Sequence, residues 1–195
     1  MTYRLRQSLL ALMVMLTGCA QLPGSTTGSG IAPRPTRMAI DAFTLAGRIA
    51  IHQEQRHYAV NISWQHTPES DEIMLATPLG QGVAELTRNA AGTRLIAADR
   101  REYNAPDWQA LGTRMFGLDL PLAHLPRWLV GDVPTDALGV KYDGMGRPQQ
   151  WVADGWLVNF LGYESGAADA LPSLIELNRG EIEVRLKIDD WQLPP

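Results

Sequence analysis

The chain has 195 residues, of which 17 are Lys or Arg and 21 are Asp or Glu, so its formal charge is −4. This length fits one globular domain and leaves no room for two large ones. Apolar residues make up 45% and charged residues 19%, which is enough apolar surface for a packed core and excludes an intrinsically disordered chain. The acidic balance, without long runs of like charge, argues against nucleic acid as a partner.

Residues 1–18 have the features of a secretory signal peptide. Arg4 and Arg6 precede an apolar stretch at 9–16, which is followed by small residues. The stretch is far shorter than the roughly 20 apolar residues that a membrane-spanning helix needs, so we expect it to be cleaved.

Cys19 is the only cysteine, which excludes an internal disulfide and multi-cysteine metal sites. The tetrapeptide Leu16-Thr17-Gly18-Cys19 resembles the lipobox of bacterial lipoproteins, and a chance buried cysteine is the alternative. The resemblance implies covalent acyl chains on Cys19, no further cofactor, and effectively irreversible membrane anchoring. The next residue is Ala20 and not the Asp that tends to retain lipoproteins in the inner membrane, which favours the outer membrane.

Residues 20–40 are rich in Gly, Ser, Thr and Pro, a composition typical of a flexible linker. A disordered end without a role explains the composition equally well. The sequence therefore predicts a signal peptide at 1–18, a lipidated flexible tether at 19–40 and a single folded domain at 41–195.

Two strands, each with one apolar face, begin the folded domain. Apolar side chains alternate with other residues over 43–51 and over 58–64, and the short connection between them favours an antiparallel hairpin. Shorter strands are predicted at 72–77, 81–88 and 93–98, and together these segments form a meander.

Apolar residues spaced by three and four predict two short amphipathic helices between Pro106 and Gly131. A proline near each start and a glycine after each end fit the usual boundaries of helices. Pro126 restricts the second helix, so its boundaries stay open.

The strand pattern resumes after Tyr142, with strands predicted at 149–153, 156–163, 173–177 and 181–188. Asp154-Gly155, between the first two of these strands, predicts a type I′ hairpin turn. About eight or more antiparallel strands result, and a sheet of that size tends to curl. The predicted fold class is mainly β (α+β): an incomplete antiparallel β-barrel with a short helical lid over an apolar cavity. A closed core that is filled by its own side chains would show the same alternation.

The sequence contains no motif with catalytic or metal-binding spacing. The four histidines lack the spacing of metal ligands, and the serine within 162–166 stands one place too late for a nucleophile elbow. We therefore predict neither a metal site nor an enzyme, with an esterase-like activity as a remote alternative.

The segment Thr77-Pro78-Leu79-Gly80 joins two predicted strands. Pro and Gly suit a turn, but turn chemistry gives no role to a large apolar residue between them. Either Leu79 folds back onto the core, or it is exposed at the tip of the loop and contacts an apolar partner such as a membrane.

Several short motifs follow one another through the folded part. In chain order they are Leu-x-Gly-Arg at Leu45–Arg48, the strand ending in Trp64, Thr-Pro-Leu-Gly at 77–80, Gly-Leu-Asp-Leu-Pro-Leu at 117–122 running into Leu125-x-x-Trp128-Leu129-x-Gly131, Trp156–Tyr163, and Leu186-x-Ile188-x-x-Trp191. In this order, behind a lipobox, they resemble the LolB family of outer-membrane lipoproteins, which receive other lipoproteins from the periplasmic carrier LolA and insert them. The resemblance does not extend to the linker or to residues 167–174.

The resemblance implies an incomplete barrel whose apolar concave face shelters the acyl chains of a client lipoprotein, and a protruding Leu79 that promotes insertion. Four tryptophans match family positions near the cavity and are candidates for contact with the acyl chains: Trp64, Trp128, Trp156 and Trp191. The implied partners are a LolA-like periplasmic carrier, client lipoproteins and the inner leaflet of the outer membrane. We expect a monomer, anchored on the periplasmic face. The alternative is a structural or assembly lipoprotein that binds a protein partner and carries no lipid.

Overall fold

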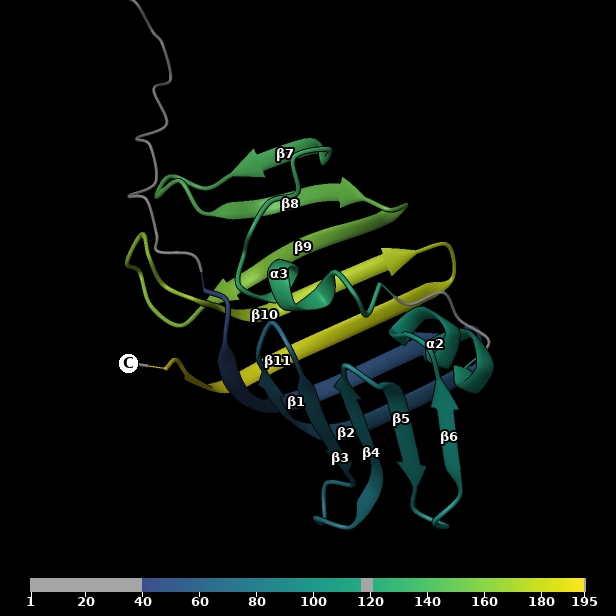
Figure 1. Ribbon diagram of the computed structural model, residues 1–195. Coiled ribbons are helices and arrows are strands. Elements are labelled where there is room, and N and C mark those ends of the chain that lie inside the picture. The colour runs from purple at the N-terminus through teal and green to yellow at the C-terminus, as the bar shows by residue number, and fades with distance from the viewer. Residues whose placement is uncertain (1–39, 117–120, 195) are drawn as a thin grey trace, which may run out of the picture. The chain divides into compact units, whose positions relative to one another are not determined.

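The computed structural model describes residues 40–116 and 121–194, which hold eleven strands and two helices (Figure 1). In chain order the strands are β1 (Phe43–Gln53), β2 (Arg56–His66), β3 (Asp71–Ala76), β4 (Gly82–Asn89), β5 (Gly92–Ala97), β6 (Glu102–Ala105), β7 (Leu138–Tyr142), β8 (Pro148–Ala153), β9 (Trp156–Tyr163), β10 (Pro172–Arg179) and β11 (Ile182–Gln192). The helices α2 (Trp108–Phe116) and α3 (Leu125–Leu129) lie between β6 and β7 in the chain. The predicted signal peptide, Cys19 and the tether lie outside the described residues.

The strands form one antiparallel sheet in the order β6-β5-β4-β3-β2-β1-β11-β10-β9-β8-β7. Two meanders, β1 to β6 and β7 to β11, are joined where the first strand pairs with the last. Within the described residues the edge strands β6 and β7 do not pair with each other, so the sheet stays open. This topology confirms the prediction of a mainly β, incomplete barrel.

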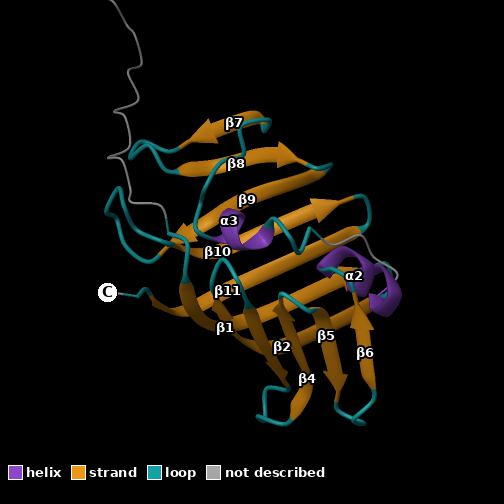
Figure 2. Cartoon of the chain, viewed as in Figure 1, coloured by secondary structure: helices purple, strands orange, loops and turns teal. Residues whose placement is uncertain are grey.

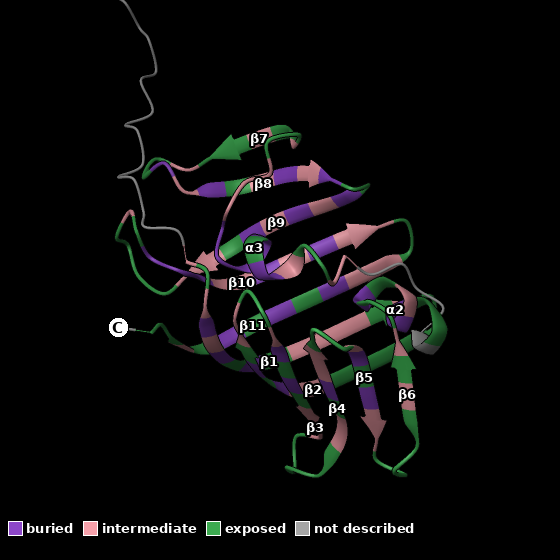
Figure 3. Ribbon diagram, viewed as in Figure 1, coloured by how far each residue is buried: buried purple, intermediate pink, exposed green. Residues whose placement is uncertain are grey.

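The two-residue period of the strands places one row of side chains in the core. In β11, Val184, Leu186 and Ile188 are buried while Arg185 and Lys187 are exposed, and Figure 3 shows buried and exposed residues alternating along several strands. The turn between β8 and β9 has positive φ at both Asp154 (50°) and Gly155 (74°), as the predicted type I′ turn requires.

The sequence pattern did not predict β6 or β7. The prediction that strands resume only after Tyr142 is wrong, because β7 spans Leu138–Tyr142. Both missed strands form sheet edges and are short, at four and five residues. Neither contains a buried residue. Such short strands carry too few residues to show a clear apolar alternation, and only partly buried side chains, Tyr103, Ala105 and Val140, pack against the core.

The two helices lie on the same side of the sheet, across the inside of its curve (Figure 2). Helix α3 has only five residues, and Pro126 lies in its first turn, where a missing N–H costs no helical hydrogen bond. Gly131 follows with a φ of 78°, and its N–H donates to the carbonyl of Trp128 at 2.9 Å, which ends the helix.

The core lies between the concave face and the helices. Its largest fully buried side chains are those of Trp128, Trp151 and Trp156. The cluster of core residues runs from Ile40 to Trp191, so this part of the chain carries a complete hydrophobic core and meets the requirement for folding on its own. No helix among the described residues has the length and apolar character needed to cross a bilayer.

Candidate functional site

The connection between β3 and β4 is a tight turn that projects Leu79. The N–H of Gly80 donates to the carbonyl of Thr77 at 2.8 Å, and the N–H of Thr77 donates to the carbonyl of Gln81 at 2.8 Å. The hydroxyl of Thr77 also accepts the N–H of Gln81 at 3.2 Å. Pro78 restricts φ at the second turn position and Gly80 adopts a φ of 83°, so both ends of the turn are held.

Leu79 is 91% exposed, more than any other large apolar side chain described. A leucine folded back onto the core would lose most of that exposure, so the structure shows the exposed alternative. Leaving a leucine side chain in water instead of burying it costs about 2 kcal/mol, which it recovers on entering an apolar phase. Contact of Leu79 with a membrane stays a prediction.

Three of the candidate tryptophans, Trp64, Trp128 and Trp156, belong to the hydrophobic core, and Trp191 packs against that core. Trp64 in β2 and Trp191 in β11 both pack edge-on against Phe43, with ring centroids 5.8 and 5.2 Å apart. Trp128 in α3 and Trp156 in β9 are buried in the core. Contact of these rings with acyl chains also stays a prediction.

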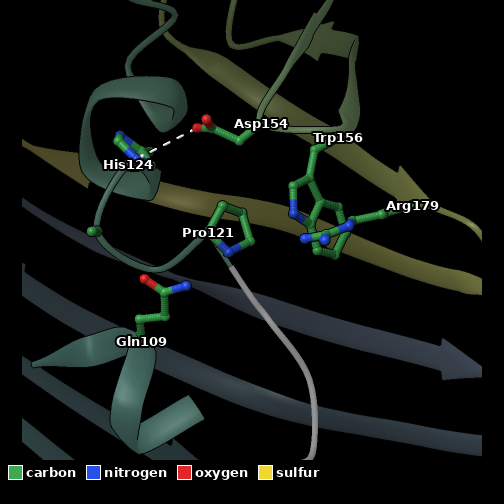
Figure 4. Close-up of a pocket in the computed structure, with 7 residues that line it drawn as sticks. Gln109, Pro121, His124, Asp154, Trp156 and Arg179 are labelled. Carbon is green, nitrogen blue, oxygen red and sulfur yellow. Dashed lines mark ion pairs between the residues drawn. The ribbon is translucent and has the colours of Figure 1, made fainter. Parts of the chain in front are cut away.

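Trp156 lines a cavity of about 300 Å³ between α2, the segment before α3 and the β8–β9 turn (Figure 4). At its rim, Nε2 of His124 lies 3.4 Å from Oδ2 of Asp154. The guanidinium of Arg179 lies 5.8 Å from the centroid of the Trp156 ring. The rest of the lining consists of Gln109, Pro121 and Ala123.

A larger cavity, of about 640 Å³, lies between α2, the chain leading into α3 and the ends of β3, β4 and β5. Its wall includes Trp108, Asp71, Arg88, Leu122 and Pro126. Both cavities have volumes in the range of small-molecule sites, and both mix charged with apolar side chains. Of the four candidate tryptophans only Trp156 lines either of these two cavities, and the apolar cavity expected from the sequence stays a prediction.

Asp71, at the edge of the larger cavity, is a buried carboxylate that holds α2 to the sheet. Its Oδ1 accepts Nε1 of Trp64 at 2.9 Å and lies 2.5 Å from Nδ1 of His66. Its Oδ2 accepts Nε of Arg88 at 2.5 Å and Nε1 of Trp108 at 3.2 Å. Burial raises the pKa of Asp71, but these four partners outweigh burial and lower that pKa to about 2. One side chain therefore connects β2, β3, β4 and α2.

The sequence pattern did not single out Asp71 or Trp108 as site residues. A signal was present, because Asp71 and Ile73 share a face of β3 and both are buried. A charged residue in the apolar row of a strand needs a buried partner. Its partners could not be read from the sequence, because Arg88 and Trp108 belong to other elements.

The four histidines do not converge on one point. His66 lies beside Asp71 and His124 lies at the smaller cavity, while His52 packs edge-on against His57 with ring centroids 4.6 Å apart. In residues 40–116 and 121–194, no group of three or more His, Cys, Asp or Glu side chains could hold a metal ion.

Comparison with known proteins identifies the family. A family model described as "Outer membrane lipoprotein LolB" matches residues 41–191. The chain belongs to the LolB family. The match covers nearly the same span as the motifs that indicated this family in the sequence.

Curated relatives of the LolB family match almost the whole chain. The outer-membrane lipoprotein LolB of Azoarcus sp. (strain BH72) is 33% identical over 185 residues, which cover 94% of this chain and 95% of the relative. The protein of the same name from Nitrosomonas europaea is 34% identical over 197 residues, covering 96% and 92%. Family membership places this chain in the outer membrane. Among solved structures, a LolA superfamily protein from Nitrosomonas europaea has a TM-score of 0.49 at 10% identity, over 82% of this chain and 89% of that one.

Proposed function

We propose that this LolB-family protein accepts acylated lipoproteins from a LolA-like periplasmic carrier and inserts them into the outer membrane. It acts as a monomer, anchored on the periplasmic face through acyl chains on Cys19. The observation that carries the proposal is the 91% exposure of Leu79 on a braced turn, in a chain of the LolB family. The transfer makes and breaks no covalent bond, so it needs no catalytic residue. The family assignment favours this function over that of a structural lipoprotein.

The open sheet suits a protein that shelters acyl chains and then releases them. Exposing a 16-carbon chain to water costs on the order of 10 kcal/mol, at about 0.8 kcal/mol per CH₂, so a client cannot cross the periplasm unprotected. Because β6 and β7 do not pair, the concave face beneath the lid of α2 and α3 is open at the edges of the sheet, and no hydrogen bonds between strands need to break there. Trp156 is the best-supported of the four tryptophans for acyl contact, because it borders a cavity beneath this lid.

Leu79 would act at the last step, when the client leaves for the bilayer. The turn holds Leu79 away from the protein's own core, so its apolar side chain enters the membrane surface without unfolding anything else. Because the periplasm offers no ATP, the client must bind this protein more tightly than it binds the carrier, and must enter the bilayer more favourably still.

Substitution of Leu79 tests the proposal. Leu79→Glu should leave client binding unchanged and lower transfer of an acylated client to liposomes about tenfold or more, because a carboxylate cannot enter the apolar layer cheaply. The measurement follows a fluorescently labelled client from the carrier to sedimented liposomes.

A matched control is Met145→Glu, which places the same charge on an exposed apolar residue of another turn, 45% exposed. Transfer by this variant should equal that of the wild type. Undiminished transfer by Leu79→Glu would refute the proposed role of the loop.

A further inference from the structure

Two loops leave the same end of the sheet side by side. Loop 77–81 joins β3 to β4, and loop 98–101 joins β5 to β6. Strand β4 pairs with β5, and the N–H of Ala98 donates to the carbonyl of Val83 at 2.9 Å, just beyond the first loop. Figure 1 shows both loops at the lower end of the sheet. The second loop therefore lies next to the turn that carries Leu79, at the same end of the sheet.

The second loop carries a net positive charge. Nε of Arg101 lies 2.6 Å from Oδ2 of Asp99, so these two charges compensate each other. Arg100 is exposed, and its side chain makes no hydrogen bond or ion pair with any residue that the structure describes. The uncharged 77–81 loop and the 98–101 loop together carry one unbalanced cation, in a chain whose formal charge is −4.

The backbone of Arg100 is held in an unfavourable conformation. Its φ is 64°, in the left-handed region that glycine and asparagine usually occupy. The N–H of Arg100 donates to the carbonyl of Ala97 at 2.8 Å, which closes the turn in this form. Glycine would fill this position without strain, so the arginine can be replaced by glycine without disturbing the turn.

We propose that loops 77–81 and 98–101 form a membrane-docking tip, in which Leu79 enters the apolar layer and Arg100 binds the phosphate groups of anionic phospholipids. This inference rests on the proposed function, since only that function brings the Leu79 loop to a bilayer. A leucine alone does not distinguish anionic from zwitterionic lipid, whereas an adjacent guanidinium does.

Vesicle binding by the folded part from Ile40 to Pro195 tests the tip, because this fragment lacks the acyl anchor and carries the whole described core. Binding is measured by co-sedimentation, and binding to vesicles of phosphatidylcholine alone is compared with binding to vesicles that also contain phosphatidylglycerol. Anionic lipid should raise the affinity about fivefold for one cation at the surface, and added salt should remove the gain. Leu79→Ser should weaken binding to both kinds of vesicle.

The substitution Arg100→Gly removes the positive charge of the loop without lowering its stability. Glycine relieves the positive φ, so the melting temperature should stay the same or rise, while the preference for anionic vesicles should disappear. The matched control is Lys141→Gln, which removes an exposed cation from β7 at the opposite edge of the sheet and should keep the preference.

The proposed docking tip is refuted if Arg100→Gly binds anionic vesicles as tightly as the wild type does. It is also refuted if Lys141→Gln loses the preference for anionic vesicles as fully as Arg100→Gly does. The client-transfer assay reports separately on the proposed function. Normal transfer without any anionic preference refutes the tip alone. An anionic preference that Arg100→Gly removes, together with undiminished transfer by Leu79→Glu, supports lipid binding by Arg100 and refutes the insertion role of Leu79.

Discussion

Asp71 shows how one charged side chain can hold a helix against a sheet. Its carboxylate is 1% exposed, and a charge so deeply buried is tolerated only when it is paired and hydrogen-bonded. Arg88 supplies the opposite charge, and the indole N–H groups of Trp64 and Trp108 supply neutral donors. Because Trp108 begins α2, loss of the carboxylate would loosen the lid as well as the core.

The substitution Asp71→Asn measures this contribution. It should lower the free energy of unfolding at pH 7 by about 2–4 kcal/mol, because Arg88 then loses its buried partner. The pKa of Asp71 is lowered to about 2 from the ordinary 3.8, so its stabilisation is complete above about pH 4 and is lost as the pH falls towards 2. Urea unfolding of both proteins between pH 7 and pH 2 should show the difference shrinking across that window.

An exposed ion pair provides the control for Asp71. Glu102→Gln breaks the contact of Glu102 with Arg94, in which both side chains are nearly half exposed, and should change the free energy of unfolding by less than about 1 kcal/mol. A difference between wild type and Asp71→Asn that stays constant down to pH 2 would contradict the assigned cause.

At the level of elements, the pairing of β1 with β11 joins the two meanders. The register shifts between Ala46 and Gly47, which marks a bulge in the ladder. A Cβ added at Gly47 would lie 2.2 Å from the carbonyl oxygen of Lys187, a distance that no side chain tolerates. The glycine of the Leu-x-Gly-Arg motif is therefore required by the close approach of the last strand.

Gly47→Ala should accordingly destabilise the domain by at least about 2 kcal/mol, since the backbone of β11 must move to admit the methyl group. Thermal unfolding followed by circular dichroism measures the effect. Gly82→Ala is the matched control at another strand glycine, with open space around the added methyl group, and should shift the stability by no more than about 0.5 kcal/mol. Equal effects of the two substitutions would show that packing at the β1–β11 pairing is not the cause.

For the whole molecule, the decisive property is whether the concave face stays partly unfilled beneath the lid. An open sheet of eleven strands provides the surface, and two short helices cover it. Native packing leaves few large voids in an ordinary core, so a persistent apolar space would be a functional feature.

A fluorescent fatty-acyl probe tests for that space. The wild-type domain should bind the probe with a rise in fluorescence, because the chain leaves water for an apolar environment, and an acylated client should displace it. Native mass spectrometry should show the added mass of one ligand. If neither method detects uptake, the interior is filled, and the protein-binding alternative gains support.

The sequence by itself determined the features that depend on neighbours along the chain. Alternation predicted the long strands, Asp154-Gly155 predicted a type I′ turn that the structure confirms, and the order of short motifs indicated the LolB family. These signals are local, because a strand's period and a turn's φ values depend on consecutive residues.

Only the tertiary structure decided which distant residues meet. It added β6 and β7 as edges, showed Leu79 exposed, surrounded Asp71 with partners from three other elements, and placed loop 98–101 at the same end of the sheet as the Leu79 turn. The physical reason is that burial, ion pairing and strand order depend on contacts between segments far apart in the chain. Periodicity along one segment carries no information on such contacts.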